Sequence, residues 1–138
     1  MTYGMLKSLT RVLLTGDHVL TNKEDELRAL VAYAYDKVAT ESDALKLFTS
    51  DKSDNILRLG PGKLYVRSPR LPQADEEELD IDDQLGYPTA RYIASFVSKD
   101  KGGIHVNEAH TLIRAYNAKV QAYFEALEAA GELDPEDA

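Results

Sequence analysis

Hydrophobic residues recur at helical spacing in several parts of the chain, and this pattern predicts most of the fold. The first such part covers about residues 3–14. A second helix is expected to start at an N-cap of Thr21 or Asn22 and to run past residue 38, with three carboxylates in its first turn. A third is expected over about 83–98, with Pro88 in its first turn or at a kink. Its inward residues are expected to be Leu85, Ala90, Ile93, Ala94 and Val97.

The last expected helix, over about 104–130, has the most regular pattern. Its apolar positions follow each other at alternating steps of three and four, as in a coiled-coil seam. The pattern favours antiparallel packing against the earlier helices of the same chain. A helix shared between subunits is the alternative that the pattern leaves open. The seam residues are Val106, Ala109, Ile113, Tyr116, Val120, Tyr123 and Leu127.

The middle of the chain has a different character, because two short β-prone runs flank a Gly-Pro-Gly turn at 60–62. This arrangement predicts a β-hairpin, with Ile56 opposite Val66 and Leu57 opposite Tyr65. A lone hairpin is barely stable in water, so it must pack on the helices or pair with another chain. The short apolar stretch at 44–48 fits either a helical turn or an extended segment.

Seven acidic residues lie among the nine positions from 75 to 83. Only Leu79 and Ile81 interrupt the run, and their spacing of two predicts an extended segment that is held at two points. The domain organisation expected from these patterns is a single helical domain over 1–131. Within it lie a hairpin and arm at about 54–73 and an acidic loop at 74–83, and a disordered acidic tail follows at 132–138.

Charge is distributed unevenly over the 138 residues. Residues 1–70 hold eleven Lys or Arg and nine Asp or Glu, a balance of +2, whereas residues 71–138 hold five and fifteen, a balance of -10, which gives the net charge of -8. An acidic half repels phosphate backbones, which disfavours sequence-directed DNA binding. The absence of cysteine excludes disulfides and thiolate chemistry. Without a membrane-length apolar run or a signal peptide, the expected place is the cytosol or an assembly made there.

Residues that could carry chemistry are few. His105 and His110 are five positions apart on one helix and therefore point in different directions, and His18 has no evident partner. The acidic run does not fit a calcium-binding EF-hand loop, although a looser cation site from Asp80, Asp82 and Asp83 is conceivable. We therefore expect no enzyme activity, no catalytic or metal-binding residues, and no cofactor.

The polar residues point instead to association between proteins. A basic strip of Lys63, Arg67 and Arg70 lies directly before an acidic strip at 75–83. Two such strips are complementary between copies of one chain, and head-to-tail contacts of this kind close into rings. The extended arm suits docking on a neighbour by edge pairing, and Tyr65 could be an anchor there. The expected interface residues are Lys63, Tyr65, Arg67, Arg70, Asp75, Glu76, Glu77, Glu78, Asp80, Asp82 and Asp83.

Three segments of the chain, LYVRSPRLP (64–72), ELDIDDQL (78–85) and ARYIASFVSK (90–99), carry a family resemblance. With the order of helices, arm and long final helix, they make the chain resemble small head-to-tail connector (adaptor) proteins of tailed bacteriophages over about residues 22–127. The resemblance implies a mainly α protein, a helical bundle of about four helices with a central β-hairpin or extended arm. It also implies a ring of twelve copies beneath the portal that extends the DNA channel.

The first functional hypothesis is therefore a virion structural protein at the head-tail junction, made in the host cytoplasm. Its partners would be the portal protein, neighbouring copies and a downstream tail or neck protein. DNA would pass through the ring without specific binding, and no membrane would be involved. The alternative is a small soluble intracellular interaction or regulatory module, of phage or bacterial origin, that acts through its helical face.

Overall fold

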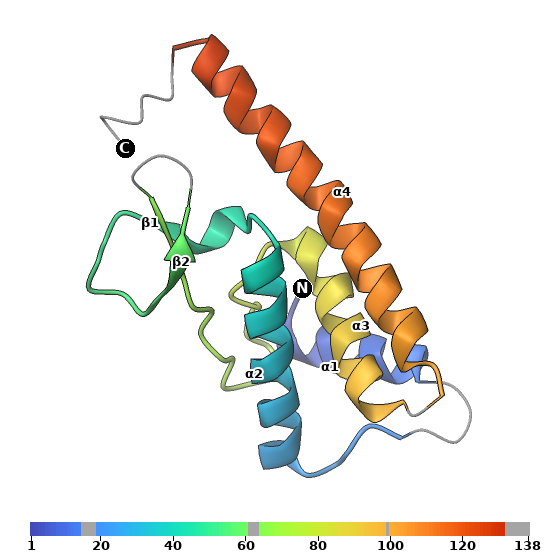
Figure 1. Cartoon of the computed structure of the whole chain (residues 1–138). Coiled ribbons are helices and arrows are strands. Elements are labelled where there is room, and N and C mark those ends of the chain that lie inside the picture. The colour runs from blue at the N-terminus through green and yellow to red at the C-terminus, as the bar shows by residue number, and fades with distance from the viewer. Residues whose placement is uncertain (15–18, 61–63, 99, 132–138) are drawn as a thin grey trace.

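A computed structural model describes residues 1–14, 19–60, 64–98 and 100–131 (Figure 1). Within these ranges the chain forms helices α1 (Tyr3–Leu13), α2 (Glu24–Glu41), α3 (Gly86–Val97) and α4 (Gly102–Ala129), and the short 3-10 helices η1 (Leu45–Leu47) and η2 (Asp83–Leu85). The strands are β1 (Phe48–Thr49), β2 (Ile56–Leu59) and β3 (Tyr65–Arg67). The expected fold class, mainly α with about four helices and a hairpin, is confirmed. The expected acidic tail at 132–138 lies outside the described residues.

The helix starts follow from local hydrogen bonds. The Thr2 hydroxyl caps α1 by accepting from the Met5 N–H at 3.2 Å. The N-cap expected for α2 at Thr21 or Asn22 is wrong, because α2 begins after Lys23. There the Thr21 hydroxyl accepts from the Lys23 N–H at 3.1 Å, which ties the chain in a turn just before the helix.

Helix α3 lies at the centre of the bundle, where it contacts α1, α2 and α4 (Figure 1). It is buried on most sides, which suits its apolar composition. The small residues Ala90 and Ala94 are fully buried and allow neighbouring helices to approach closely. Pro88 lies in the first turn, as expected, where the missing N–H has no partner to lose. Val97, expected inside, is only half-buried.

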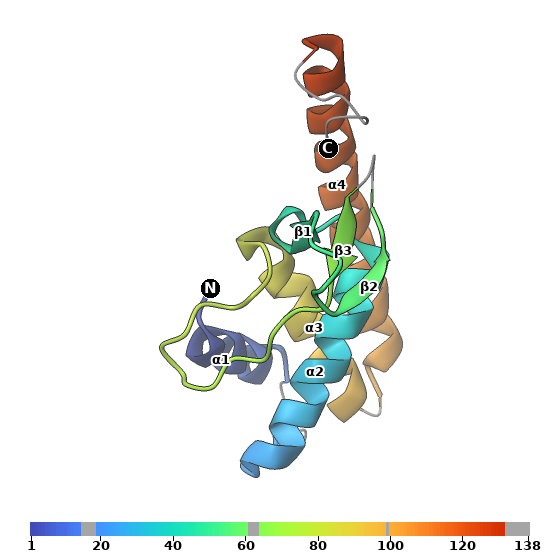
Figure 2. The same ribbon diagram turned by 90° about the vertical axis from the view of Figure 1, so that its left-hand side faces the viewer.

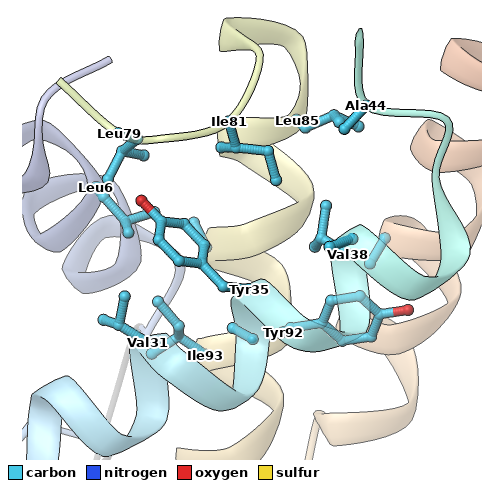
Figure 3. Close-up of a cluster of buried hydrophobic side chains, with 14 of the residues drawn as sticks. Leu6, Val31, Tyr35, Val38, Ala44, Leu79, Ile81, Leu85, Tyr92 and Ile93 are labelled. Carbon is cyan, nitrogen blue, oxygen red and sulfur yellow. The ribbon is translucent and has the colours of Figure 1, made fainter. Parts of the chain in front are cut away.

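Residues from distant parts of the sequence form one core (Figure 3). Leu79 and Ile81, the two apolar residues of the acidic run, are 2% and 1% exposed and point among α1, α2 and α3. The prediction that they hold this segment at two points is confirmed. Burial of each such side chain stabilises the fold by about 1.5–3 kcal/mol, so the acidic segment is fixed along its path despite its charge.

The sheet is antiparallel with strand order β1-β3-β2, so the expected hairpin gains a third strand that the sequence left open. The predicted register is wrong: Tyr65 pairs with Leu59 and Val66 with Arg58, and the register shifts between Arg58 and Ile56. The Gly60 N–H donates to the Leu64 carbonyl at 3.0 Å. Gly60, which the prediction assigned to the turn, is therefore paired with Leu64 in the structure.

The sheet is fastened to the helices by Arg58. Its guanidinium donates to the carbonyls of Ala39 and Ser42 at the C-terminal end of α2 and lies 3.2 Å from the Asp43 carboxylate. The C-terminal end of a helix carries a partial negative charge and unpaired carbonyls, so a cation there is favourable. The hairpin thus packs on a helix, as its size requires.

Helix α4 packs on α3 and then continues beyond it (Figures 1 and 2). Its buried residues are His105, Ala109, Ile113, Tyr116 and Val120. Tyr123 is 52% exposed and Leu127 only half-buried, so the predicted seam is intramolecular as far as Val120 and only partly covered after it. Phe124, on a neighbouring face of the helix, contacts Phe48 with ring centroids 5.7 Å apart.

Candidate functional site

The basic arm and the acidic segment, expected to meet between copies, meet within the chain. The Arg67 guanidinium binds Asp80 through two hydrogen bonds, of 2.5 Å from Nη1 to Oδ2 and 2.8 Å from Nη2 to Oδ1. The Arg70 N–H donates to Asp80 Oδ2 at 2.7 Å. Both side chains of the pair are largely buried, at 12% and 17% exposed. This fork geometry is the strong form of the arginine–carboxylate contact.

These contacts set the charge state of Asp80. Burial raises the pKa of its carboxyl, while the hydrogen bonds from Arg67 and from the Arg70 N–H lower it by more. The net pKa lies below the ordinary value, so Asp80 is ionised at neutral pH. Arg67 and Asp80 therefore act in the structure of the monomer and hold the arm against the acidic segment.

Most of the other expected interface residues also have partners in the chain. Asp75 binds Lys7 Nζ at 2.6 Å. Glu77 accepts from the Gln73 N–H, and Asp82 accepts from the Lys46 N–H. The Met1 ammonium binds Glu78 at 2.9 Å and Asp83 at 2.6 Å. The Tyr65 ring has Lys52 Nζ 5.9 Å from its centroid.

Several of these groups nevertheless remain open to a partner. The Arg70 side chain is 69% exposed although its Nη2 lies 3.4 Å from Asp54, and Glu76 is exposed as well. Asp83 is 83% exposed despite its ion pair. Lys63 lies outside the described residues. The interface role of this set therefore stays a prediction.

The conceivable cation site is not assembled. Asp80 faces Arg67, Asp82 faces the Lys46 backbone and Asp83 faces the Met1 ammonium. In the part of the chain that the structure describes, no group of three or more imidazole, thiol or carboxylate side chains could hold a metal ion.

A second surface, which the sequence analysis did not identify, is a groove lined by residues of α2 and α4, the two helices that lie on either side of α3 (Figure 1). It consists of two cavities of about 300 and 240 Å³ that share Glu41. We call this surface the Glu41 groove and define it by Tyr33, Asp36, Lys37, Thr40, Glu41, His110, Ile113 and Arg114.

Glu41, the last residue of α2, connects all three helices. Its carboxylate accepts from the Tyr92 hydroxyl of α3 and lies 3.6 Å from His110 Nε2 of α4. Its backbone carbonyl accepts from Asn117 Nδ2 at 2.9 Å. Burial, followed by the hydrogen bond to Glu41, raises the pKa of Tyr92, so its hydroxyl stays a proton donor.

Aromatic and cationic side chains complete the groove. Tyr33 packs edge-on against Phe96 with centroids 4.9 Å apart, and Tyr33 itself is 57% exposed. Lys37 Nζ lies 5.8 Å from the Tyr33 centroid and 5.6 Å from that of Tyr92. Arg114 is exposed on the opposite wall. The lining thus combines an exposed aromatic ring with the cations Lys37 and Arg114 and the carboxylates Asp36 and Glu41. Such a mixed lining suits an amphipathic, charged protein segment.

His105 occupies a separate position from His110, as its spacing predicted. It is buried, and its Nδ1 lies 2.9 Å from Arg91 Nη1, while its Nε2 has no hydrogen-bond partner in the described part of the chain. Burial and the nearby charges of Arg91 and Lys101 lower its pKa, so the ring is neutral at neutral pH. His18 lies outside the described residues.

A sequence signal for the groove exists in retrospect. Tyr33, Lys37 and Glu41 follow each other at steps of four on α2, and His110 and Arg114 do so on α4. Such spacing places each set on one helix face. Neither set shows from sequence that the two faces lie opposite each other, because that depends on how both helices pack on α3.

Comparison with known proteins adds no relative. None of the family models, the curated proteins or the solved structures compared with the chain matches it. Among the described helices, none is both long and apolar enough to span a membrane.

Proposed function

We propose that this chain is a structural protein of a tailed bacteriophage, a head-to-tail connector that forms a ring on the portal and extends the DNA channel. The order of elements supports the proposal: two N-terminal helices, a central hairpin with an extended acidic segment, and a long final helix. In this role the protein acts by binding the portal, neighbouring copies and a downstream tail or neck protein, without catalysis.

The observation that carries the proposal is the end of α4. The helix continues beyond the rest of the bundle (Figure 2). There its seam becomes more open, because Tyr123 is 52% exposed and Leu127 is only half-buried, while Phe124 beside them packs on Phe48. A helix end that keeps an apolar stripe in water is typical of a surface that another protein covers. This feature favours a protein that is completed by assembly.

The charge distribution is compatible with a DNA channel. Glu76, Glu77, Glu78 and Asp83 are exposed along one segment, and carboxylates repel the phosphate backbone. A ring that presents this segment to its lumen would let DNA pass without binding it. The same segment on the outer rim of an assembled ring would contradict this part of the proposal.

The first test is quantitative mass spectrometry of gradient-purified virus particles. The connector role predicts this chain in particles at an amount comparable with the portal protein. Its presence in the lysate but absence from particles would contradict the role and favour the intracellular interaction module.

A second test separates the exposed charges from the structural ones. Arg70→Glu together with Glu76→Lys is expected to reduce incorporation into particles, because both side chains are exposed and neither belongs to the Arg67–Asp80 pair. Unchanged thermal unfolding verifies that the loss of the Arg70–Asp54 contact leaves the protein folded. The matched control is Lys23→Glu, a charge reversal at an exposed position before α2. Equal incorporation of all three proteins would contradict a role for the arm and acidic segment.

A further inference from the structure

The end of α4, residues 121–129, has the chemistry of a docking segment. Tyr123 and Leu127 are one turn apart and continue the buried seam, whereas the neighbouring Glu125 and Glu128 are exposed. Ala122 and Ala126 lie on the other side of the stripe and are small enough for a close approach. The segment is therefore an amphipathic helix with one acidic edge.

The Glu41 groove offers the complementary surface. Tyr33 is 57% exposed in one cavity and the almost fully buried Ile113 lines the other, so apolar side chains can be buried there. Lys37 on α2 lines one cavity and Arg114 on α4 lines the other, so each can face a carboxylate of an incoming helix. The Glu41 carboxylate already accepts from the Tyr92 hydroxyl and lies beside His110, so part of its hydrogen-bonding capacity is used within the chain.

The groove cannot receive the end of its own helix. Arg114 and Glu128 belong to one rigid helix and are separated along its axis by about 21 Å, at 1.5 Å per residue. A contact between the groove and the end of α4 must therefore join two molecules. Because both surfaces belong to every copy, one such contact recurs in each copy of an assembly.

We propose that the end of α4 from a second copy of this chain occupies the Glu41 groove. Tyr123 and Leu127 of the incoming helix enter the two cavities, and Glu128 faces Arg114 or Lys37. The inference rests on the proposed function, since it names the neighbouring copy as the molecule that covers the end of α4. The proposed contact between the end of α4 and the Glu41 groove uses residues other than those of the basic strip (Lys63, Arg67 and Arg70) and the acidic strip (75–83).

Disulfide trapping tests the contact directly, because the chain contains no cysteine and every disulfide comes from an introduced pair. One full-length protein carries Thr40→Cys in the groove, and a second, with a different affinity tag, carries Glu128→Cys. Mild oxidation of the mixture at high protein concentration is expected to give the mixed disulfide. The matched control replaces Thr40→Cys by Asp25→Cys, an exposed position at the other end of the same helix. Equal yields from both mixtures would overturn the proposal.

Charge reversal tests the assigned polarity. In sedimentation velocity, Arg114→Glu and Glu128→Lys are each expected to weaken self-association about two- to fivefold, the range for exposed ion pairs. The double variant is expected to recover, since the reversed charges attract again. Tyr123→Ser with Leu127→Ser should weaken association more than about tenfold. All these positions are partly or fully exposed, and unchanged thermal unfolding verifies that the variants fold. A double variant as weak as the singles would overturn the assignment.

The two proposals fail in different experiments. If the chain is absent from virus particles but the Thr40–Glu128 disulfide forms, the connector role is wrong and the contact stands. If the chain is in particles but that disulfide forms no better than the control, the contact is wrong and the connector role stands.

Discussion

At the scale of single residues, the pair of Arg67 and Asp80 is the contact on which the arm depends. Removing one partner of a largely buried ion pair leaves the other charge without compensation. We expect Asp80→Asn to lower the free energy of unfolding by about 2–3 kcal/mol. Urea denaturation followed by circular dichroism measures this change. Glu76→Gln, an exposed acidic position four residues away, is the control and should change the free energy by less than about 0.5 kcal/mol.

The same pair predicts a pH dependence. The pKa of Asp80 is lower in the folded protein than in the unfolded chain, so the unfolded chain binds the proton more readily. The stability that Asp80 contributes is present above its unfolded pKa of about 3.9 and is lost as the pH falls through the folded pKa. Unfolding curves of wild type and Asp80→Asn should therefore differ at pH 7 and converge at low pH. A difference that persists at the lowest pH would contradict the ionised state of Asp80.

Sequence reasoning placed these two residues in complementary strips but assigned them to different copies. Opposite charges alone do not state whether they meet within or between chains. In the structure the two charges meet within one chain. Leu79 and Ile81 anchor the acidic segment in the core, and the short path from the arm brings Asp80 back to Arg67. Burial of the acidic segment could be predicted from its apolar residues. The pairing of Arg67 with Asp80 depends on the turn of the chain between these two residues.

At the scale of elements, α4 holds the corner that follows α2. Asn117 Oδ1 accepts from the Asp43 N–H at 2.8 Å, and its Nδ2 donates to the Glu41 carbonyl. The neighbouring Tyr116 hydroxyl accepts from the Leu45 N–H at 3.1 Å. One helix thus satisfies three backbone groups of the segment that leads from α2 to the sheet.

We expect Asn117→Ala to cost about 2 kcal/mol, because it leaves a half-buried N–H and carbonyl without partners. Hydrogen exchange should show faster exchange of the Asp43 amide in the variant, with the Val31 amide inside α2 much less affected. Gln121→Ala, one turn further on the same helix and exposed, is the control. Equal exchange of Asp43 in wild type and Asn117→Ala would contradict the role assigned to this side chain.

The helices were easier to predict than the sheet for a physical reason. Periodic burial over many residues averages out single irregular positions, as α4 shows with five buried residues at regular steps. The hairpin register depends on one hydrogen bond, between the Gly60 N–H and the Leu64 carbonyl, and on a shift between Ile56 and Arg58. The strand β1 is two residues long and has no periodic pattern to recognise.

At the scale of the whole molecule, the bundle and the end of α4 should differ in stability. The buried residues of α4 all lie between 105 and 120, whereas among residues 125–129 only Leu127 is half-buried and the others are exposed. In the isolated protein, amides of the last turns are expected to exchange more than about tenfold faster than those near Ile113. Hydrogen exchange followed by mass spectrometry measures the difference. Uniform protection along α4 would mean that the end is already covered in solution.

The Glu41 groove can be recognised only at the scale of the whole molecule, which is why the sequence analysis did not predict it. Its residues come from two helices, α2 and α4, and form one surface only because both helices flank α3. The periodic pattern predicted that these helices pack together. The rotation of each helix about its axis, which decides whether Lys37 and Arg114 line adjoining cavities, depends on the fit of side chains such as Tyr92 and Ile113.

The contact between α1 and the acidic segment has a consequence for protein synthesis. Lys7 binds Asp75, which lies 68 residues further along the chain, and the Tyr3 N–H donates to the Glu77 carbonyl. At 5–20 residues per second, a ribosome needs roughly 3–14 s to make the residues between Lys7 and Asp75. During this interval the apolar face of α1 lacks the acidic segment, and it also lacks α3, which follows later in the chain. A chaperone would therefore have this time to bind α1 before its packing partners are made.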